Sequence, residues 1–147
     1  MKTISTSRRI EAPVERVFAT VADIANYAKA VDTITAVEFI GEKRRGVGTR
    51  FRETRLMKGR PQTTELEVTE FAENDHVRMV SDAGGTIWDT VFQVRADKGA
   101  TELSMRMEAR PYRLLARIFN PLIRGMVVRA VESDMDAVRR HCEASKG

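Results

Sequence analysis

The segment RRIEAPVERVFATVADIANYAKAV, residues 8–31, decides the fold because it joins a strand-like end to helical periodicity. Pro13 ends the strand that begins near Thr3, and it suits the first position of a helix, where the N–H that proline lacks would be unpaired. The apolar face of this helix comprises Val14, Val17, Phe18 and Val21. Asp23 is a favourable N-cap for a second helix, whose apolar face comprises Ile24, Tyr27, Ala28 and Val31. The segment predicts a strand end and two short helices.

The rest of the chain up to residue 109 has the period-two pattern of β-strands. Strand candidates cover residues 33–40, 49–57, 63–71, 76–81, 86–94 and 102–109. Turn signals separate them: GEKRRGVG, KGRP, ENDH, DAGG and ADKG. These connections are too short for crossover helices, so we expect an antiparallel meander of about seven strands, counting the first.

One face of this sheet is apolar, and an apolar helix follows it. In the last strand, Leu103, Met105 and Met107 alternate with polar residues. A short helix is expected over residues 112–119. A long helix is then expected to begin at Asn120 and Pro121 and to end near Ala144. Its apolar stripe comprises Ile123, Val127, Val131, Met135, Val138 and Cys142. The pattern predicts an α+β fold in which this helix covers the sheet.

Composition limits the classes of protein that need to be considered. The 147 residues, 42% hydrophobic and 31% charged, fit a single domain over residues 1–147. One cysteine excludes an intramolecular disulfide framework, and the first residues resemble neither a signal peptide nor a membrane span, so a cytoplasmic protein is expected. The net charge of +4 comes from scattered arginines and does not demand an acidic partner.

The usual catalytic motifs are missing from the sequence. His76 and His141 are far apart, and neither a GxSxG motif nor a Walker loop is found. Two distant histidines and one cysteine do not make a zinc site, so we expect no metal and no cofactor. A hydrolase, a metalloenzyme and a nucleotide triphosphatase are therefore disfavoured.

One polar group of residues remains, in TRFRETRLM. If Phe51 faces inward, alternation brings Glu53 and Arg55 to the same side, where two buried charges would pair with each other or with a ligand. Hydroxyl groups of Tyr27, Ser81 and Thr90 could join them. A bulge that shifts the register by one residue would instead leave Glu53 and Arg55 in solvent or in a salt bridge at the rim.

Four segments carry a resemblance to a known family. They are IEAPVERVFATVADIANY (10–27), GVGTRF (46–51), TELEVTEFAENDHVRM (64–79) and PLIRGMVVRAVESDMDAVRRHCE (121–143). With them the chain resembles the START-like (SRPBCC) superfamily, and within it the polyketide cyclase/dehydrase and lipid-transport family. The resemblance implies a helix-grip fold, in which a curved antiparallel sheet wraps around the long C-terminal helix and encloses an apolar cavity.

The resemblance implies the cavity, and the alternation along the strands indicates which of their residues face it. Its methionines either adapt to a ligand or simply fill the core. The residues expected to line it are Tyr27, Phe51, Glu53, Arg55, Met79, Ser81, Trp88, Thr90, Phe92, Met105, Met107, Ile123, Met126 and Val127.

The resemblance implies several functions. The one we expect is binding of a hydrophobic small molecule such as a lipid, an isoprenoid or a polyketide-like compound. The alternative is a polyketide cyclase or dehydratase in which Glu53 moves a proton while Arg55 or Tyr27 stabilises an enolate, although no complete catalytic group stands out. A further alternative is a coenzyme Q-binding or ribosome-associated protein, to which DIANYAKAV is loosely similar. Those groups have proline and aromatic residues where this chain has Ala28, Lys29 and Ala30.

Macromolecular partners are less well indicated. We expect no DNA binding, and RNA binding is disfavoured because the basic loop at Lys43, Arg44 and Arg45 contains no aromatic residue. The amphipathic segment 110–124 could contact a membrane surface transiently, or pack on its own domain or on a second subunit, so a homodimer stays open.

Overall fold

The computed structural model describes residues 2–57 and 59–144, with side chains for 3–57, 59–115 and 124–144. In chain order, the elements are β1 (Lys2–Ile10), α1 (Val14–Ala22), α2 (Ile24–Ala30), β2 (Ile34–Ile40), β3 (Arg50–Met57), β4 (Arg60–Ala72), β5 (His76–Ala83), β6 (Thr86–Asp97), β7 (Ala100–Pro111) and α3 (Leu114–Ala144). This is the predicted order from β1 to β7. Several strands are longer than predicted because their hairpins remain paired up to tight turns, as in β4, which starts at Arg60.

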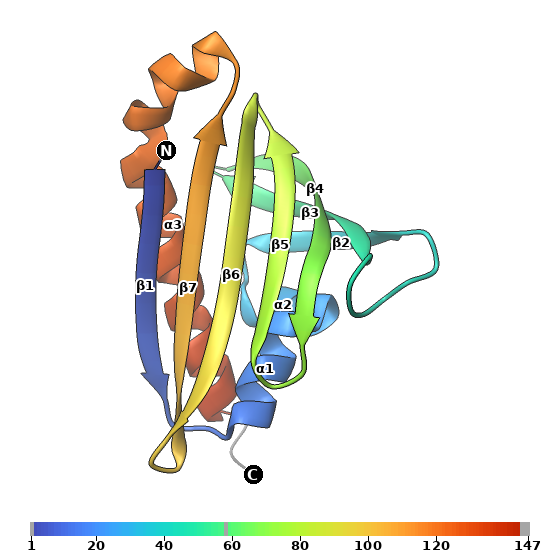
Figure 1. Ribbon diagram of the computed structural model, residues 1–147, viewed down its shortest axis with the longest axis vertical. Coiled ribbons are helices and arrows are strands. Elements are labelled where there is room, and N and C mark those ends of the chain that lie inside the picture. Colours follow the sequence, from blue (N-terminus) through green and yellow to red (C-terminus); the bar gives the residue numbers. More distant parts are fainter. Residues whose placement is uncertain (1, 58, 145–147) are drawn as a thin grey trace.

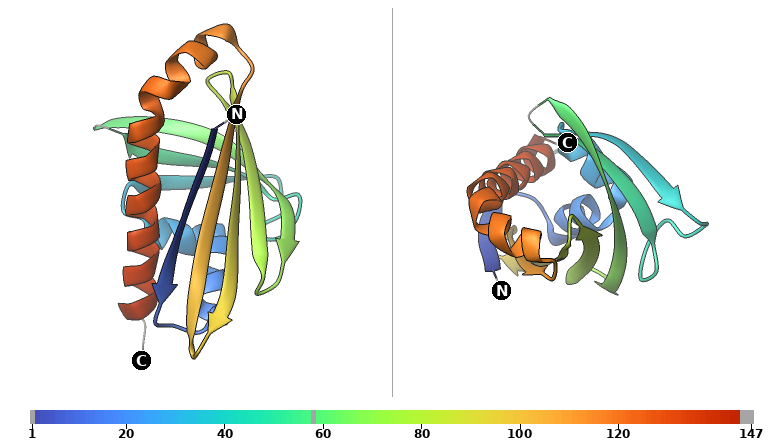
Figure 2. Two further views of the ribbon diagram at one scale, coloured as in Figure 1. Left: turned by 60° about the vertical axis from the view of Figure 1, so that its left-hand side comes forward. Right: turned by 90° about the horizontal axis from the view of Figure 1, so that it is seen from above.

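The seven strands form one antiparallel sheet in the order β1-β7-β6-β5-β4-β3-β2 (Figure 1). Strands β2 to β7 follow one another as a meander, and β1 joins the free edge of β7. The sheet curves around α3, and α1 and α2 lie near one end of the concave side (Figure 2). This is the predicted helix-grip fold, and it buries one face of the sheet against one stripe of α3.

The decisive N-terminal segment folds as two short helices. Pro13 is the N-cap of α1, one position earlier than predicted. Asp23 caps α2 as expected, because its Oδ1 accepts hydrogen bonds from the backbone N–H groups of Ala25 at 3.0 Å and Asn26 at 3.3 Å. Phe18 on α1 meets Phe71 of β4 edge to face, with ring centroids 5.4 Å apart. The ring contact packs α1 against β4 at one end of the sheet.

Helix α3 differs from the prediction at its start. The prediction of a separate short helix and a long helix starting at Asn120 is wrong, because one helix runs from Leu114 to Ala144. The helix bends between its orange first turns and its red body (Figure 2). Pro121 therefore lies inside α3 rather than at its start. A proline inside a helix has no backbone N–H to donate and favours a bend. No helix within the described residues is long and apolar enough to cross a membrane.

The body of α3 closes the core against the sheet. Its residues Val131, Met135, Val138 and Cys142 are buried. Arg8 of β1 ties it to the edge of the sheet, with salt bridges to Glu132 at 2.7 Å and Asp136 at 2.8 Å.

The turn between β5 and β6 holds the start of α3 in place. The carbonyl of Gly85 accepts hydrogen bonds from the N–H groups of Tyr112 at 2.9 Å and Arg113 at 3.3 Å. Gly85 has a φ of +82°, and a Cβ there would lie 2.8 Å from the Cβ of Arg113. Glycine is therefore required where this turn meets the β7–α3 junction.

Candidate functional site

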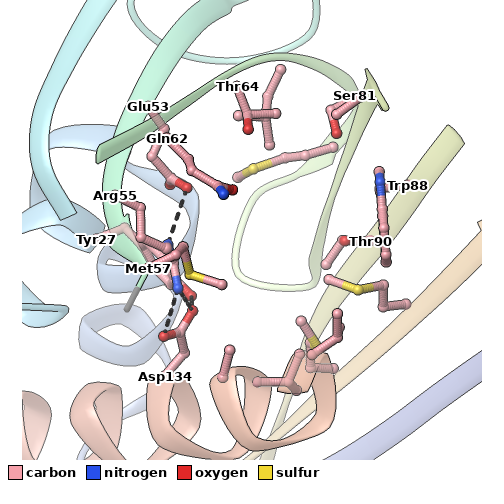
Figure 3. A pocket seen from close by; sticks show the side chains of 18 of the residues that line it. Tyr27, Glu53, Arg55, Met57, Gln62, Thr64, Ser81, Trp88, Thr90 and Asp134 are labelled. Carbon is pink, nitrogen blue, oxygen red and sulfur yellow. Dashed lines mark hydrogen bonds and ion pairs between the residues drawn. The ribbon is translucent and has the colours of Figure 1, made fainter. Parts of the chain in front are cut away.

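A pocket of about 430 Å³ lies between the concave face of the sheet and α3 (Figure 3). Side chains from β3 to β7 and from all three helices line it, and most of them are apolar. Of the predicted lining residues, all but Ile123 are found there; Ile123 lies outside the residues whose side chains are described. The residues that sequence reasoning missed are Val21, Ile24, Met57, Gln62, Thr64, Leu66, Ala83, Gly84, Ala130, Val131 and Asp134.

The register of β3 places Glu53 and Arg55 inside this pocket. The β3–β4 ladder keeps one register from Arg50 to Met57, so Phe51, Glu53 and Arg55 all point to the concave face. A bulge does occur nearby, but it lies in β2, between Ile34 and Ala36. The structure therefore does not adopt the alternative register, in which Glu53 and Arg55 would reach solvent.

Four side chains form a polar cluster at one end of the pocket (Figure 3). Arg55 Nη1 donates to both carboxylate oxygens of Asp134 at 3.0 Å, and the Tyr27 hydroxyl donates to Asp134 Oδ2, also at 3.0 Å. Arg55 Nε lies 3.5 Å from Glu53 Oε2. The charged side chains are only 12–19% exposed. Tyr27, Glu53, Arg55 and Asp134, here called the polar cluster, thus join α2, β3 and α3.

Asp134 is the member of the polar cluster that sequence reasoning missed. It lies three residues after Val131 and four before Val138, within the apolar stripe of α3. A carboxylate at an apolar position of an amphipathic helix is a detectable signal. Without the fold, however, the sequence does not show that Arg55, 79 residues earlier, would meet it.

Burial shifts the protonation of the polar cluster. Desolvation raises the pKa of Glu53, and Arg55 only partly offsets this effect. The pKa of Asp134 is raised for the same reason, against the opposing effect of Arg55. Burial and the neighbouring Asp134 hold the pKa of Tyr27 well above its ordinary range, so Tyr27 stays a neutral donor. Burial acts to lower the pKa of Arg55, but Asp134 and Glu53 outweigh it, so Arg55 stays charged.

The remaining polar residues are spread along the strands. Gln62 and Thr64 come from β4, Ser81 from β5 and Thr90 from β6, and all four face the pocket (Figure 3). Trp88, the one tryptophan of the chain, lies on the same wall. Neutral hydrogen-bonding groups thus surround a largely apolar space, which suits a ligand with one polar end.

Other candidate chemistry lies away from the pocket. His76 contacts Asp75 at 2.6 Å and Glu70 at 3.1 Å at a hairpin end. Within residues 2–57 and 59–144, no group of His, Cys, Asp and Glu side chains is arranged to hold a metal ion. In the basic loop, Arg44 stacks on Phe39 at 4.8 Å and Arg45 on Phe71 at 4.6 Å. These two arginines therefore pack on the chain's own aromatic rings.

Comparison with known proteins establishes the family. The sequence profile described as "Polyketide cyclase / dehydrase and lipid transport" matches residues 1–143. No curated protein matches the sequence.

Solved structures share the fold at low sequence identity. A protein of Thermus thermophilus superposes with a TM-score of 0.81 at 17% identity, covering 99% of this chain and 100% of that one. A START superfamily protein from Mycobacterium smegmatis gives 0.78 at 14% identity and 97% coverage of both chains. The di-domain ARO/CYC protein BexL from the BE-7585A biosynthetic pathway gives 0.77 at 15% identity, covering 97% of this chain and 50% of that one. The chain therefore belongs to the polyketide cyclase/dehydrase and lipid-transport family, and it shares its helix-grip fold with these solved structures.

Proposed function

We propose that this protein binds a hydrophobic small molecule, such as a lipid, an isoprenoid or a polyketide-like compound, in the pocket between the sheet and α3. The observation that carries the proposal is the pocket itself, about 430 Å³ with mainly apolar walls and one polar cluster. Small-molecule sites in proteins typically have this volume and this combination of apolar surface with a few polar groups.

The walls suit a flexible apolar body. Five methionines line the pocket, and thioether side chains adapt to irregular shapes at little cost. They are Met57, Met79, Met105, Met107 and Met126. The polar cluster occupies one end, so it would orient the polar group of the ligand while the apolar body contacts the methionines and Trp88.

The test is to look for a bound molecule and then to block its site. A native mass spectrum of the purified protein, beside an organic extract, reports any ligand that copurifies. Titration with decanol should change the emission of Trp88, which lines the pocket. Ala130→Phe fills the pocket from α3 and should abolish the change, whereas Ala144→Phe, at an exposed position on the same helix, should preserve it. Equal responses of the two variants would contradict the proposal.

A second candidate function is a cyclase or dehydratase reaction on such a molecule. The observation that favours it is Glu53, a carboxylate of raised pKa beside a fixed guanidinium. Glu53 would take a proton from the carbon next to a ketone, and Arg55 would stabilise the enolate oxygen that results. With a polyketide-like substrate, Glu53→Gln should abolish turnover while binding of a neutral ligand persists. Unchanged turnover would remove Glu53 from the reaction.

A further inference from the structure

The polar cluster has an unbalanced charge. Glu53 and Asp134 are two carboxylates, and Arg55 is the only cation among the described residues that line the pocket. When both carboxylates are ionised, the cluster carries one net negative charge while its three charged side chains are at most 19% exposed. A buried net charge is costly, so it favours either a proton or a positively charged ligand.

The two carboxylates are not equally satisfied. Asp134 accepts two hydrogen bonds from Arg55 and one from Tyr27, all at 3.0 Å. Glu53 has the looser contact, 3.5 Å from Arg55 Nε, and it lies beside Gln62 at the wall of the pocket (Figure 3). Glu53 therefore keeps acceptor capacity toward the interior, whereas Arg55 already faces two anions. An anionic head group would meet a guanidinium that is occupied and a carboxylate that repels it.

From this geometry we infer that the pocket selects an apolar molecule whose polar end is a cationic amine, held by Glu53, and that it rejects anionic lipids such as fatty acids. The inference rests on the proposed function and refines it, because it names the class of ligand. An ammonium group at Glu53 would balance the cluster, with one cation for each carboxylate.

A proton competes with the amine for Glu53 in the ligand-free protein. The groups that face Glu53 are Arg55 on its own strand, Asp134 on α3, Tyr27 on α2, and the uncharged Gln62 and Thr64 on β4. Burial raises the pKa of Glu53 in this setting. Below the folded pKa of Glu53, binding of an amine should therefore release a proton, and affinity should increase as the pH rises through the titration of Glu53.

A chain-matched series of probes tests the inference: decylamine, decanol and decanoate, each titrated into the purified protein and followed by Trp88 emission. We expect decylamine to bind at least tenfold more tightly than decanoate, with decanol between them. Calorimetry in two buffers of different ionisation enthalpy, at a series of pH values, should show proton release with decylamine that fades as the pH rises above the folded pKa of Glu53, and none with decanol. Alkylamines keep their charge between about pH 5 and 8, like lysine, so the pH dependence belongs to the protein.

Variants assign the selectivity to Glu53. Glu53→Gln should bring decylamine to within about twofold of decanol, whereas Glu38→Gln, an exposed carboxylate 2.6 Å from Arg52, should keep the preference of the native protein. Binding of decanoate as tightly as decylamine by the unmodified protein would overturn the inference while leaving the proposed function intact. If none of the three probes binds and Trp88 does not respond, the proposed function fails as well.

Discussion

At the scale of single residues, Glu53 makes the pocket sensitive to pH. Its raised pKa means that the folded protein binds more protons than the unfolded chain between the ordinary carboxyl pKa and the folded value. The contribution of Glu53 to stability is therefore full at low pH and is lost as the pH rises through the folded pKa. The pKa of Asp134 is also raised, so its contribution to stability changes with pH in the same direction. Asp136 on the outer side of α3 instead has a lowered pKa, due mainly to its hydrogen bond with Arg8. The salt bridge of Asp136 is instead lost on acidification.

The variant Glu53→Gln should reveal the pH dependence of the contribution of Glu53 to stability. Because glutamine does not titrate, the free energy of unfolding of the variant relative to the native protein should increase as the pH rises from about 4, the ordinary carboxyl range. This difference in the free energy of unfolding should level off above the folded pKa of Glu53. Urea denaturation at a series of pH values measures it. A difference that stays constant with pH, or that decreases, would show that Glu53 is not a buried carboxylate of raised pKa.

Loss of Arg55 should destabilise the fold. Arg55→Met leaves Glu53 and Asp134 without their cation, and breaking a buried ion pair typically costs about 3–5 kcal/mol. The side chains of Arg55 and Asp134 are still 18% and 12% exposed, so we expect the free energy of unfolding to fall by about 2–4 kcal/mol at neutral pH. The cost should shrink as acid protonates the carboxylates. The control is Arg52→Met, an exposed position of the same strand, which should change stability by less than about 0.5 kcal/mol. Equal losses for the two variants would contradict this account.

At the scale of elements, helix α2 connects a capping residue to the pocket. Asp23 caps the helix, and Tyr27, one turn later, donates to Asp134. Asp23→Ala should lower the free energy of unfolding by about 1 kcal/mol, since the N-terminal N–H groups lose their acceptor. Asp23→Ser should retain most of the stability. Chemical denaturation of the three proteins makes the comparison, and a serine variant as unstable as the alanine variant would exclude capping as the cause.

The elements were largely predictable from the sequence, because each depends on local periodicity. Pro13 and Asp23 mark the boundaries of the first helices, and the alternation Leu103, Met105, Met107 reports the buried face of β7. The start of α3 was not predictable in this way, because Pro121 has two uses, to begin a helix or to bend one. Local signals cannot choose between them, since the choice depends on how the first turns pack.

At the scale of the whole molecule, the pocket is a product of the curved sheet and one long helix. Most lining residues follow from strand alternation, but the polar cluster needs α2, β3 and α3 to meet. The pairing of Arg55 with Asp134 spans 79 residues of sequence, so it could not be read from any local pattern. What could be predicted was the presence of Glu53 and Arg55 on one strand face. Their pairing with Asp134 on α3 could not be predicted.

Ligand binding should stabilise the whole fold, because sheet and helix both contact the pocket. A ligand present at about 100 times its Kd adds about 2.7 kcal/mol to the free energy of unfolding. For a chain of 147 residues this corresponds to a rise in Tm of about 5–10 °C. In a series of straight-chain alcohols, each added methylene should contribute about 0.8 kcal/mol, or about fourfold in Kd, while it still enters the apolar end.

The series should then stop improving once the chain exceeds the space available, about 430 Å³. Differential scanning calorimetry at fixed ligand concentration locates this limit as the chain length at which Tm ceases to rise. Ala130→Phe should move the limit to shorter alcohols, and Ala144→Phe should leave it unchanged, because only Ala130 lines the pocket. A Tm that keeps rising with chain length in both variants would place the alcohols on the surface of the protein, since a pocket of limited volume fills up and an open surface does not.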